Sequence, residues 1–343
     1  MWRSGGFNST GRLFEAIDPH WPESICSVAS PSSFVSATRV TVTTAWLPLV
    51  GPPSKRGDPS SSRTGSAPQP TPNGTQMSAP ENPQGTVTPR GLTRPHDTWA
   101  EWYDVVYDAC FGDTFAWLTE ATVNTVLTKA PAGARIVDFG AGTGRLAIPL
   151  ARLGFRIHAV EPSGPMLSQL VAKSAREADP IAITTEQIDI QSFTGRGEFD
   201  VALCVFTVLI YVTTVPELRA ALKAMSDALR PGGLLLIDLP DPSVFESFTA
   251  DTQDVFRIVR ITRDPLEAQT EPGTGFTFDE ETLIKAPHLH RYHDRFPVRF
   301  WPPEVVREYA SEYGLAVIAD LSSEFSPAAS TYWWLEKLAH TPV

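Results

Sequence analysis

The sequence predicts an α/β protein whose core is a doubly wound, mainly parallel sheet. Three observations support this fold class. From Trp99 onward, short β-rich apolar segments alternate with helical ones, which is typical of parallel strands connected by helices. A glycine-rich turn at residues 140–144 follows the first β segment directly. A carboxylate, Glu161, ends the second β segment, and strand ends are where open α/β sheets bind ligands.

Apolar periodicity justifies each element in turn. Helical spacing at residues 99–107 and 115–127 precedes the alternating region. Within that region, strands are expected at residues 135–139, 156–160, 181–188, 200–206 and 234–239, and helices at 146–153, 165–176 and 216–229. After Pro240 come longer β segments at 255–262, 276–285 and 288–300, a helix at 302–313, and strands at 315–321 and 331–338. The sequence therefore predicts a β insertion before a final hairpin.

The chain has 343 residues, enough for two domains or for one large domain with an extension. Residues 1–95 contain 14 of the 31 prolines and carry a net charge of +3, whereas the remainder carries −14. Proline lacks an amide donor and sustains neither a helix nor a central strand. We therefore expect residues 1–94 to be a disordered Pro/Ser-rich extension and residues 95–343 to fold. A transit peptide and a translation start at Met77 are alternative interpretations of the extension.

Charge and cysteine content disfavour several classes of protein. A formal net charge of −11 argues against binding to nucleic acid or to a membrane surface. No apolar run approaches the roughly 18 residues that span a bilayer, and the first residues lack the order of a secretory signal. Cys26, Cys110 and Cys204 show no paired spacing, so we expect neither a disulfide framework nor a metal site. These features predict a cytoplasmic protein.

The glycine turn has the properties of a nucleotide-binding loop. Its glycines permit positive φ angles and let a ligand approach the backbone. Glu161, 17 residues after Gly144, can accept both hydroxyls of a ribose. A dinucleotide fingerprint reads G-x-G-x-x-G, but here Arg145 holds the third glycine position, which counts against NAD. A tight turn with an incidental acid is the alternative interpretation.

Five motifs then occur in a family-specific order: residues 137–144 (VDFGAGTG), Glu161, residues 187–190 (QIDI), residues 198–202 (EFDVA) and residues 229–233 (LRPGG). With these motifs, the sequence resembles the class I S-adenosylmethionine-dependent methyltransferases over about residues 96–340. The resemblance implies a Rossmann-like, seven-stranded sheet and S-adenosylmethionine as the cofactor. It also implies an enzyme that transfers a methyl group by in-line displacement.

The resemblance further implies which residues contact the cofactor. Glu161 would bind the ribose, and Asp189 with the amide of Ile190 would bind the adenine. Tyr103 would contact or cover the methionine moiety and Asp138 would hold its ammonium group; helix packing and turn capping are the alternatives for these two residues. The full expected set is Tyr103, Asp138, Gly140, Ala141, Gly142, Gly144, Glu161, Pro162, Met166, Asp189, Ile190 and Val205.

The sequence does not identify the methyl acceptor, although a small molecule is favoured. Besides the acidic composition, residues 204–207 read Cys-Val-Phe-Thr, where DNA amino-methylating enzymes carry an Asn/Asp-Pro-Pro-aromatic tetrapeptide. An NAD(P)-dependent oxidoreductase is one alternative, disfavoured by the glycine spacing and by the lack of a Tyr-x-x-x-Lys pair. A non-catalytic module that binds S-adenosylmethionine is another.

The insertion at residues 255–301 is expected to bind the acceptor, because it emerges at the sheet edge that holds the glycine loop. A contact in a homodimer is the alternative interpretation. The sequence does not identify the catalytic residue; the candidate bases are His288, His290 and His293, with exposed polar positions as the alternative. The expected basic and aromatic wall comprises Arg291, Tyr292, His293, Arg295, Arg299 and Trp301.

Overall fold

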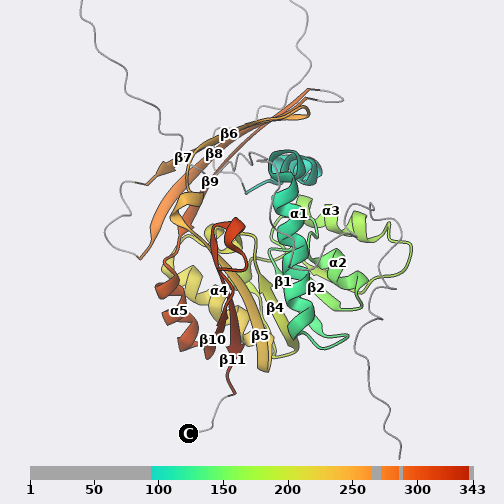
Figure 1. Ribbon diagram of the computed structural model, residues 1–343, viewed down its shortest axis with the longest axis vertical. Coiled ribbons are helices and arrows are strands. Elements are labelled where there is room, and N and C mark those ends of the chain that lie inside the picture. The colour runs from blue at the N-terminus through green and yellow to red at the C-terminus, as the bar shows by residue number, and fades with distance from the viewer. Residues whose placement is uncertain (1–93, 265–271, 286–288, 340–343) are drawn as a thin grey trace, which may run out of the picture. The chain divides into compact units, whose positions relative to one another are not determined.

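The structure, a computed structural model, describes residues 94–264, 272–285 and 289–339. These residues form a seven-stranded sheet with helices on both faces, and a separate four-stranded sheet beside one end of it (Figure 1). The predicted α/β class and the β insertion before the final hairpin are confirmed. The extension at residues 1–93 lies outside the described residues.

The seven-stranded sheet has the order β10-β11-β5-β4-β1-β2-β3. Strands β1 to β5 are parallel, whereas β11 pairs antiparallel with both β5 and β10. The chain order reverses between β1 and β4, which opens a crevice at the carboxyl ends of these strands. The bounds are β1 (Arg135–Phe139), β2 (Arg156–Val160), β3 (Ile183–Glu186), β4 (Phe199–Cys204), β5 (Leu229–Pro240), β10 (Leu315–Asp320) and β11 (Ser330–Lys337).

Each face of the sheet has its own apolar core, because alternate residues of a strand point to opposite faces. In β1, Val137 joins the core beneath α4 (Val215–Ala228) and α5 (Pro303–Glu312), whereas Ile136 joins the core on the other face. That second face is covered by α1 (Tyr103–Lys129), α2 (Ala147–Arg152) and α3 (Gly164–Ser174) (Figure 1).

The amino-terminal helical region differs from the prediction of two separate helices. Residues Asp97–Trp102 form a 3-10 helix in which Trp99 leaves helical geometry, with a φ of −133°. The following α1 is continuous from Tyr103 to Lys129 but kinks at Gly112, where φ is 35°. Glycine adopts this conformation without the steric cost of a Cβ atom.

The insertion is an antiparallel sheet of β6 (Phe248–Asp251), β7 (Val255–Arg263), β8 (Thr274–Ile284) and β9 (His290–Phe300). Strand β6 was not predicted, since four residues are too few to show an alternating pattern. Val255 and Ile284 pack against Trp99 and Val106, which fixes the insertion over the start of α1.

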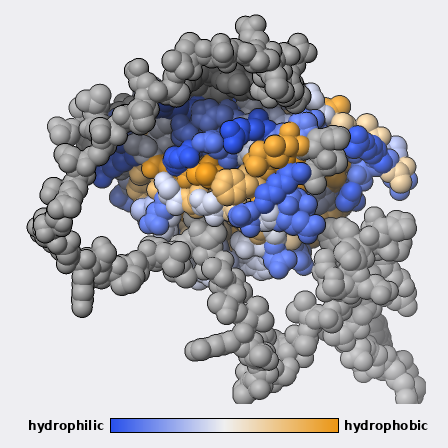
Figure 2. Space-filling model, turned by 90° about the horizontal axis from the view of Figure 1, so that it is seen from above, coloured by the Kyte–Doolittle hydropathy of each residue, from blue (hydrophilic) through white to orange (hydrophobic). Residues whose placement is uncertain are grey.

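Seen from above, the described surface of the molecule shows a band of hydrophobic residues between hydrophilic ones (Figure 2). None of the described helices is both long and apolar enough to cross a membrane.

Candidate active site

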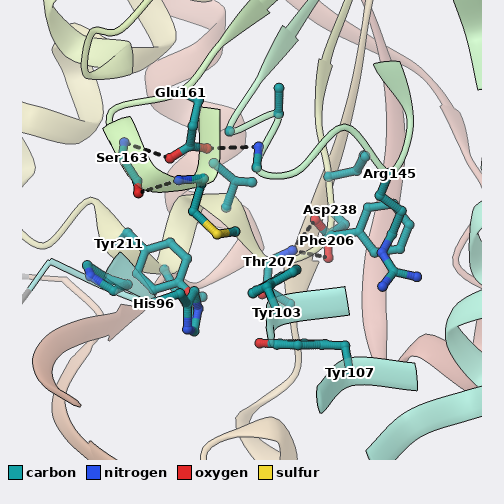
Figure 3. Close-up of a pocket in the computed structure, with 18 of the residues that line it drawn as sticks. His96, Tyr103, Tyr107, Arg145, Glu161, Ser163, Phe206, Thr207, Tyr211 and Asp238 are labelled. Atoms are coloured by element: carbon teal, nitrogen blue, oxygen red, sulfur yellow. Dashed lines mark hydrogen bonds between the residues drawn. The ribbon is translucent and has the colours of Figure 1, made fainter. Parts of the chain in front are cut away.

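A cavity of about 490 Å³ lies where the carboxyl ends of the parallel strands face the insertion. Its wall has four parts: the loops after β1 to β5, the segment from Arg94 into α1, one face of the insertion, and residues 327–332 at the start of β11. Figure 3 shows side chains from these loops and from α1 converging on the same space. The cavity thus occupies the position at which open α/β sheets bind ligands.

Glycines shape the loop after β1, but they do so in two ways. Gly140 and Gly142 line the cavity with φ angles of 74° and 54°. A Cβ atom on Gly140 would lie 2.5 Å from a methyl group of Val208, so only glycine allows the loop after β4 to come this close. Gly144 does not line the cavity; its Cβ position is 3.0 Å from Leu170 and 3.1 Å from Ile148. Gly144 therefore packs the loop against α2 and α3.

The Glu161 carboxylate, just after β2, is held by two backbone amides. Its Oε2 accepts a hydrogen bond from the Gly142 amide and its Oε1 accepts one from the Ser163 amide, both at 2.9 Å (Figure 3). The residue is 8% exposed, and burial raises the pKa of Glu161 against the opposing effect of the two amides. Each oxygen keeps a further acceptor site, so the carboxylate is oriented to receive two hydroxyl donors.

The residues expected at the adenine lie at the edge of the cavity after β3. The Asp189 carboxylate pairs with Arg94 Nη1 at 3.1 Å, and both side chains are more than 40% exposed. Such an exposed pair contributes little to stability and exchanges readily with solvent or a ligand. Ile190, Pro162, Met166 and Val205 also line the cavity. Of the twelve residues predicted to contact the cofactor, all except Gly144 line it.

Helix α1 places phenol rings beside the glycine loop. Tyr103 and Tyr107, one turn apart, stack with ring centroids 4.4 Å apart and line the cavity. Between them, Asp104 accepts a hydrogen bond from Thr143 Oγ1 and one from Lys173 Nζ, both at 2.6 Å. Burial raises the pKa of both tyrosines, so they remain neutral at physiological pH. Asp104 thus ties this helix to the loop after β1.

Two buried carboxyl groups face the cavity from the ends of β1 and β5. Burial, with a smaller contribution from the Glu161 charge, raises the pKa of Asp138 to about 7. Burial also raises the pKa of Asp238 to about 7, although the Thr207 amide donates to its two oxygens at 2.9 and 3.2 Å (Figure 3). Sequence reasoning missed Asp238. The available signal was its position at the end of a parallel strand, equivalent to that of Asp138.

The loop after β4 holds an unusual backbone conformation toward this acid. Phe206 and Thr207 have φ angles of 65° and 64°, which non-glycine residues adopt rarely and at a cost of about 1–3 kcal/mol each. This conformation directs the Thr207 amide at Asp238 and presents the Phe206 ring to the cavity. Strain of this kind is characteristic of ligand sites.

A histidine outside the predicted set, His96, lines the cavity. Its Nε2 lies 3.0 Å from the Tyr211 hydroxyl, and Figure 3 shows the two rings together. Burial, with a smaller effect of the Arg257 charge, lowers the pKa of His96 to about 3, so its imidazole is neutral. Because His96 is separate in sequence from every motif, only its tertiary position indicates a role.

Asp294 on β9 fastens the segment that carries His96. Its carboxylate accepts hydrogen bonds from the His96 amide at 3.1 Å and from Thr98 Oγ1 and Trp99 Nε1, both at 2.8 Å. The Trp99 bond accounts for the break in the predicted first helix, since it holds that side chain against the insertion. Asp294 is 1% exposed, so these bonds lie in a water-poor environment.

The insertion lines the cavity with a different set of residues from the predicted wall, none of which is a lining residue. The reason is the alternation of β9: Phe296 faces the cavity, whereas Arg291 and Arg295 are exposed. Arg299 and Trp301 are buried, where they donate to the carbonyls of Thr213 and Val212. The insertion residues that do line the cavity include Phe248, Arg257, Phe278, Glu280 and Phe296.

Two of the three histidines proposed as bases lie away from the cavity. His293 Nε2 lies 3.1 Å from Asp279 Oδ1, and His290 lies beside Trp102 with ring centroids 5.7 Å apart; neither lines the cavity. His288 lies outside the described residues. Within the described ranges, no group of three or more His, Cys, Asp or Glu side chains is arranged to hold a metal ion.

Comparison with known proteins finds a family match for the part of the chain that carries the glycine loop and Glu161. A family profile described as "Methyltransferase domain" matches residues 136–233, which run from β1 into β5. A putative methyltransferase of Geobacillus sp. (strain WCH70) is 29% identical over 144 residues, which cover 42% of this chain and 57% of that protein. Cypemycin N-terminal methyltransferase of Streptomyces sp. is 30% identical over 162 residues, covering 46% and 64%. The chain therefore spans less than two thirds of the length of these relatives.

Solved structures show the same fold. An S-adenosylmethionine-dependent methyltransferase from Clostridium acetobutylicum ATCC 824 superposes with a TM-score of 0.58 and 17% identity, covering 70% of this chain and 99% of that one. The match of residues 136–233 to a methyltransferase domain and this shared fold agree with the predicted resemblance to the class I S-adenosylmethionine-dependent methyltransferases.

Proposed function

We propose that the protein transfers a methyl group from S-adenosylmethionine to a small-molecule acceptor by in-line displacement. The observation that carries this proposal is the Glu161 carboxylate, which the Gly142 and Ser163 amides hold at the wall of the cavity. An acid fixed in this way at the end of the second strand suits the paired hydroxyls of a ribose.

The residues around the cavity fit this donor. Gly140 and Gly142 would let the ligand approach the backbone, and Glu161 would hold its ribose. Asp189, whose ion pair with Arg94 is solvent-exposed, would exchange that partner for the adenine amino group. Asp138 and Tyr103 would contact the methionine end. An oxidoreductase is less favoured because an arginine, Arg145, replaces the third glycine of the dinucleotide fingerprint. Its guanidinium lies 4.9 Å from the Phe115 ring.

S-Adenosylmethionine supplies a methyl group that is already activated for displacement by its attachment to a sulfonium. The protein then mainly has to align the acceptor and exclude water. The rings of Tyr103, Tyr107 and Phe206 line the cavity and offer π faces that attract cations. Burial keeps the two phenols neutral, so they would act on the sulfonium through their ring faces and not through a phenolate charge.

Asp238 is the group best suited to receive a proton from the acceptor. Its pKa of about 7 is close to the pH at which a general base is most effective near neutrality. His96 is unsuited to this role because its pKa of about 3 makes it a poor proton acceptor. We assign His96 to hydrogen bonding with Tyr211 instead.

The cavity favours a small acceptor over a macromolecule. Its volume of about 490 Å³ lies within the range of about 300–1,000 Å³ typical of small-molecule sites. Phe278 and Phe296 of the insertion line one side of it with apolar surface, which suits a small organic molecule.

Calorimetric titration tests the donor assignment. S-Adenosylmethionine and S-adenosylhomocysteine should bind with one site per chain, whereas NAD⁺ and NADP⁺ should not bind. Formation of S-adenosylhomocysteine during incubation with a panel of small amines, phenols and carboxylic acids then separates an enzyme from a binding module. Absence of binding by S-adenosylmethionine would refute the proposed function.

A further inference from the structure

A buried ion pair on the insertion faces the cavity. Arg257 of β7 donates from Nη2 to Oε1 of Glu280, on β8, at 2.9 Å. Both side chains are 3% exposed, and both residues line the cavity. Taking two charges out of water is costly, and a buried pair repays that cost only if its remaining polar atoms are also hydrogen-bonded.

The remaining polar atoms of this pair are not satisfied by the described residues. Arg257 Nε and Nη1 have no hydrogen-bond partner there, and neither has Glu280 Oε2. The Thr282 hydroxyl, directly across from Arg257 in the strand register, is also unpartnered within the described ranges. Nε and the two hydrogens of Nη1 thus make three buried N–H donors without a hydrogen-bond acceptor at close range, although the Tyr107 hydroxyl and the Cys110 thiol also interact with the guanidinium.

Aromatic rings hold the guanidinium in place. Its central carbon lies 5.4 Å from the Trp99 ring centroid, 5.2 Å from that of Tyr107 and 5.7 Å from that of Phe248. These rings exclude water and limit the positions that the side chain can adopt. A bound group that accepts hydrogen bonds from Arg257 would thus meet an already oriented fork.

The neighbouring charged groups do not compete for this fork. Asp294, opposite Glu280 in the strand register, accepts three hydrogen bonds from the segment that carries His96. The other arginines that line the cavity have acids of their own: Arg94 contacts Asp189 at 3.1 Å, and Arg145 lies 3.8 Å from Asp108. Among the cavity-lining arginines of the described chain, Arg257 is the one whose side chain is only 3% exposed, compared with 43% for Arg94 and 18% for Arg145.

We propose that Arg257 is the binding site for a carboxylate on the methyl acceptor, with Glu280 as the residue that positions its guanidinium. This inference rests on the proposed function and specifies the acceptor class as a small carboxylic acid with an apolar body. A carboxylate suits the unpartnered Arg257 donors because it brings hydrogen-bond acceptors in the planar geometry that a guanidinium binds in two places; Glu280 Oε2 takes no part in that contact. The rings of Phe278 and Phe296 on the same face suit the apolar body.

The test uses the full chain saturated with S-adenosylhomocysteine and three probes: benzoate, phenylacetate and 3-phenylpropionate. Each is titrated beside its carboxamide, which has nearly the same shape but no charge. In the wild type, at least one carboxylate should bind about 10- to 100-fold more tightly than its amide, the range for hydrogen bonds to charged groups. The variant with both Arg257→Gln and Glu280→Gln should lose this preference.

The double variant is used because Arg257→Gln alone leaves the Glu280 carboxylate buried and unpaired, which can unfold the protein. Glu280→Gln alone should keep or increase carboxylate affinity, since it removes a neighbouring negative charge and retains Arg257. Arg295→Gln, the same change at an exposed position on β9, is the matched control and should bind the probes like the wild type. Melting curves establish that each variant is folded.

The proposal is overturned if no carboxylate binds the wild type more tightly than its amide, or if the double variant keeps the preference. Titration with S-adenosylhomocysteine alone is read separately. If that titration fails while the carboxylate preference is present, the proposed methyl transfer is wrong but the anion site stands. If it succeeds without any carboxylate preference, the donor site stands and Arg257 serves the fold alone.

Discussion

Replacing Glu161 with alanine removes a carboxylate that serves the fold and the proposed donor site together. The Gly142 and Ser163 amides each lose an acceptor at 2.9 Å. An unsatisfied buried group costs about 1–3 kcal/mol, and water in the cavity relieves part of that cost. We therefore expect the free energy of unfolding to fall by about 2–4 kcal/mol. For a chain of this size, the melting temperature should fall by roughly 2–4 °C per kcal/mol.

The same change removes the group expected to bind the ribose. Loss of a hydrogen bond to a charged acceptor costs about 1.5–3 kcal/mol, so the affinity for S-adenosylhomocysteine should fall about 10- to 100-fold. Calorimetric titration well below the melting temperature of the variant measures this loss without interference from unfolding. This loss of affinity can be measured without knowing the methyl acceptor.

Ser163→Ala separates the two effects. The Ser163 hydroxyl caps α3 by accepting from the Met166 amide at 3.2 Å, and the loss of such a cap costs about 1 kcal/mol. This variant keeps the Glu161 carboxylate, so it should melt earlier than the wild type but bind S-adenosylhomocysteine within twofold of it. If Glu161→Ala instead loses stability while its affinity is unchanged, the carboxylate serves only the loop and the ribose assignment is wrong.

Two further predictions concern buried acids outside the sequence motifs. The pKa of Asp238 is about 7 in the folded state and about 4 in the unfolded state. Between these pH values the folded state keeps a proton that the unfolded state has lost, so the free energy of unfolding declines as pH rises. Asp238→Asn should reduce that decline, by on the order of 4 kcal/mol in urea denaturation between pH 4 and 8; an unchanged pH dependence would contradict the assignment. Asp294→Ala should destabilise the fold by about 3 kcal/mol, because the buried His96 amide and Trp99 Nε1 and the half-buried Thr98 hydroxyl lose their acceptor. It should also speed hydrogen exchange in residues 96–107, and wild-type exchange there would show that Asp294 does not hold the segment.

Local patterns in the sequence were sufficient for the parallel sheet and for the side of the cavity formed by the glycine loop and Glu161. Strands β1 and β2 occupy the predicted residues 135–139 and 156–160, because a buried parallel strand appears in the sequence as a short, nearly continuous apolar run. The acid Glu161 and the glycine loop lie together because carboxyl ends of adjacent parallel strands meet at one edge. Both inferences depend on residues that are close in the sequence.

The side of the cavity formed by the insertion could not be inferred in the same way. Alternation shows that Val255, Arg257 and Val259 share one face of β7 and that Arg291, His293 and Arg295 share one face of β9, but it does not show which face looks into the cavity. That choice depends on contacts with a distant part of the chain: the His96 amide reaches Asp294 across 198 residues, and Trp99 packs on Val255. An antiparallel sheet can leave one face in water, and a face is buried only where another element covers it. The packing of the amino-terminal segment therefore buries the face of β7 that carries Arg257, whereas Arg291 and Arg295 on β9 stay exposed.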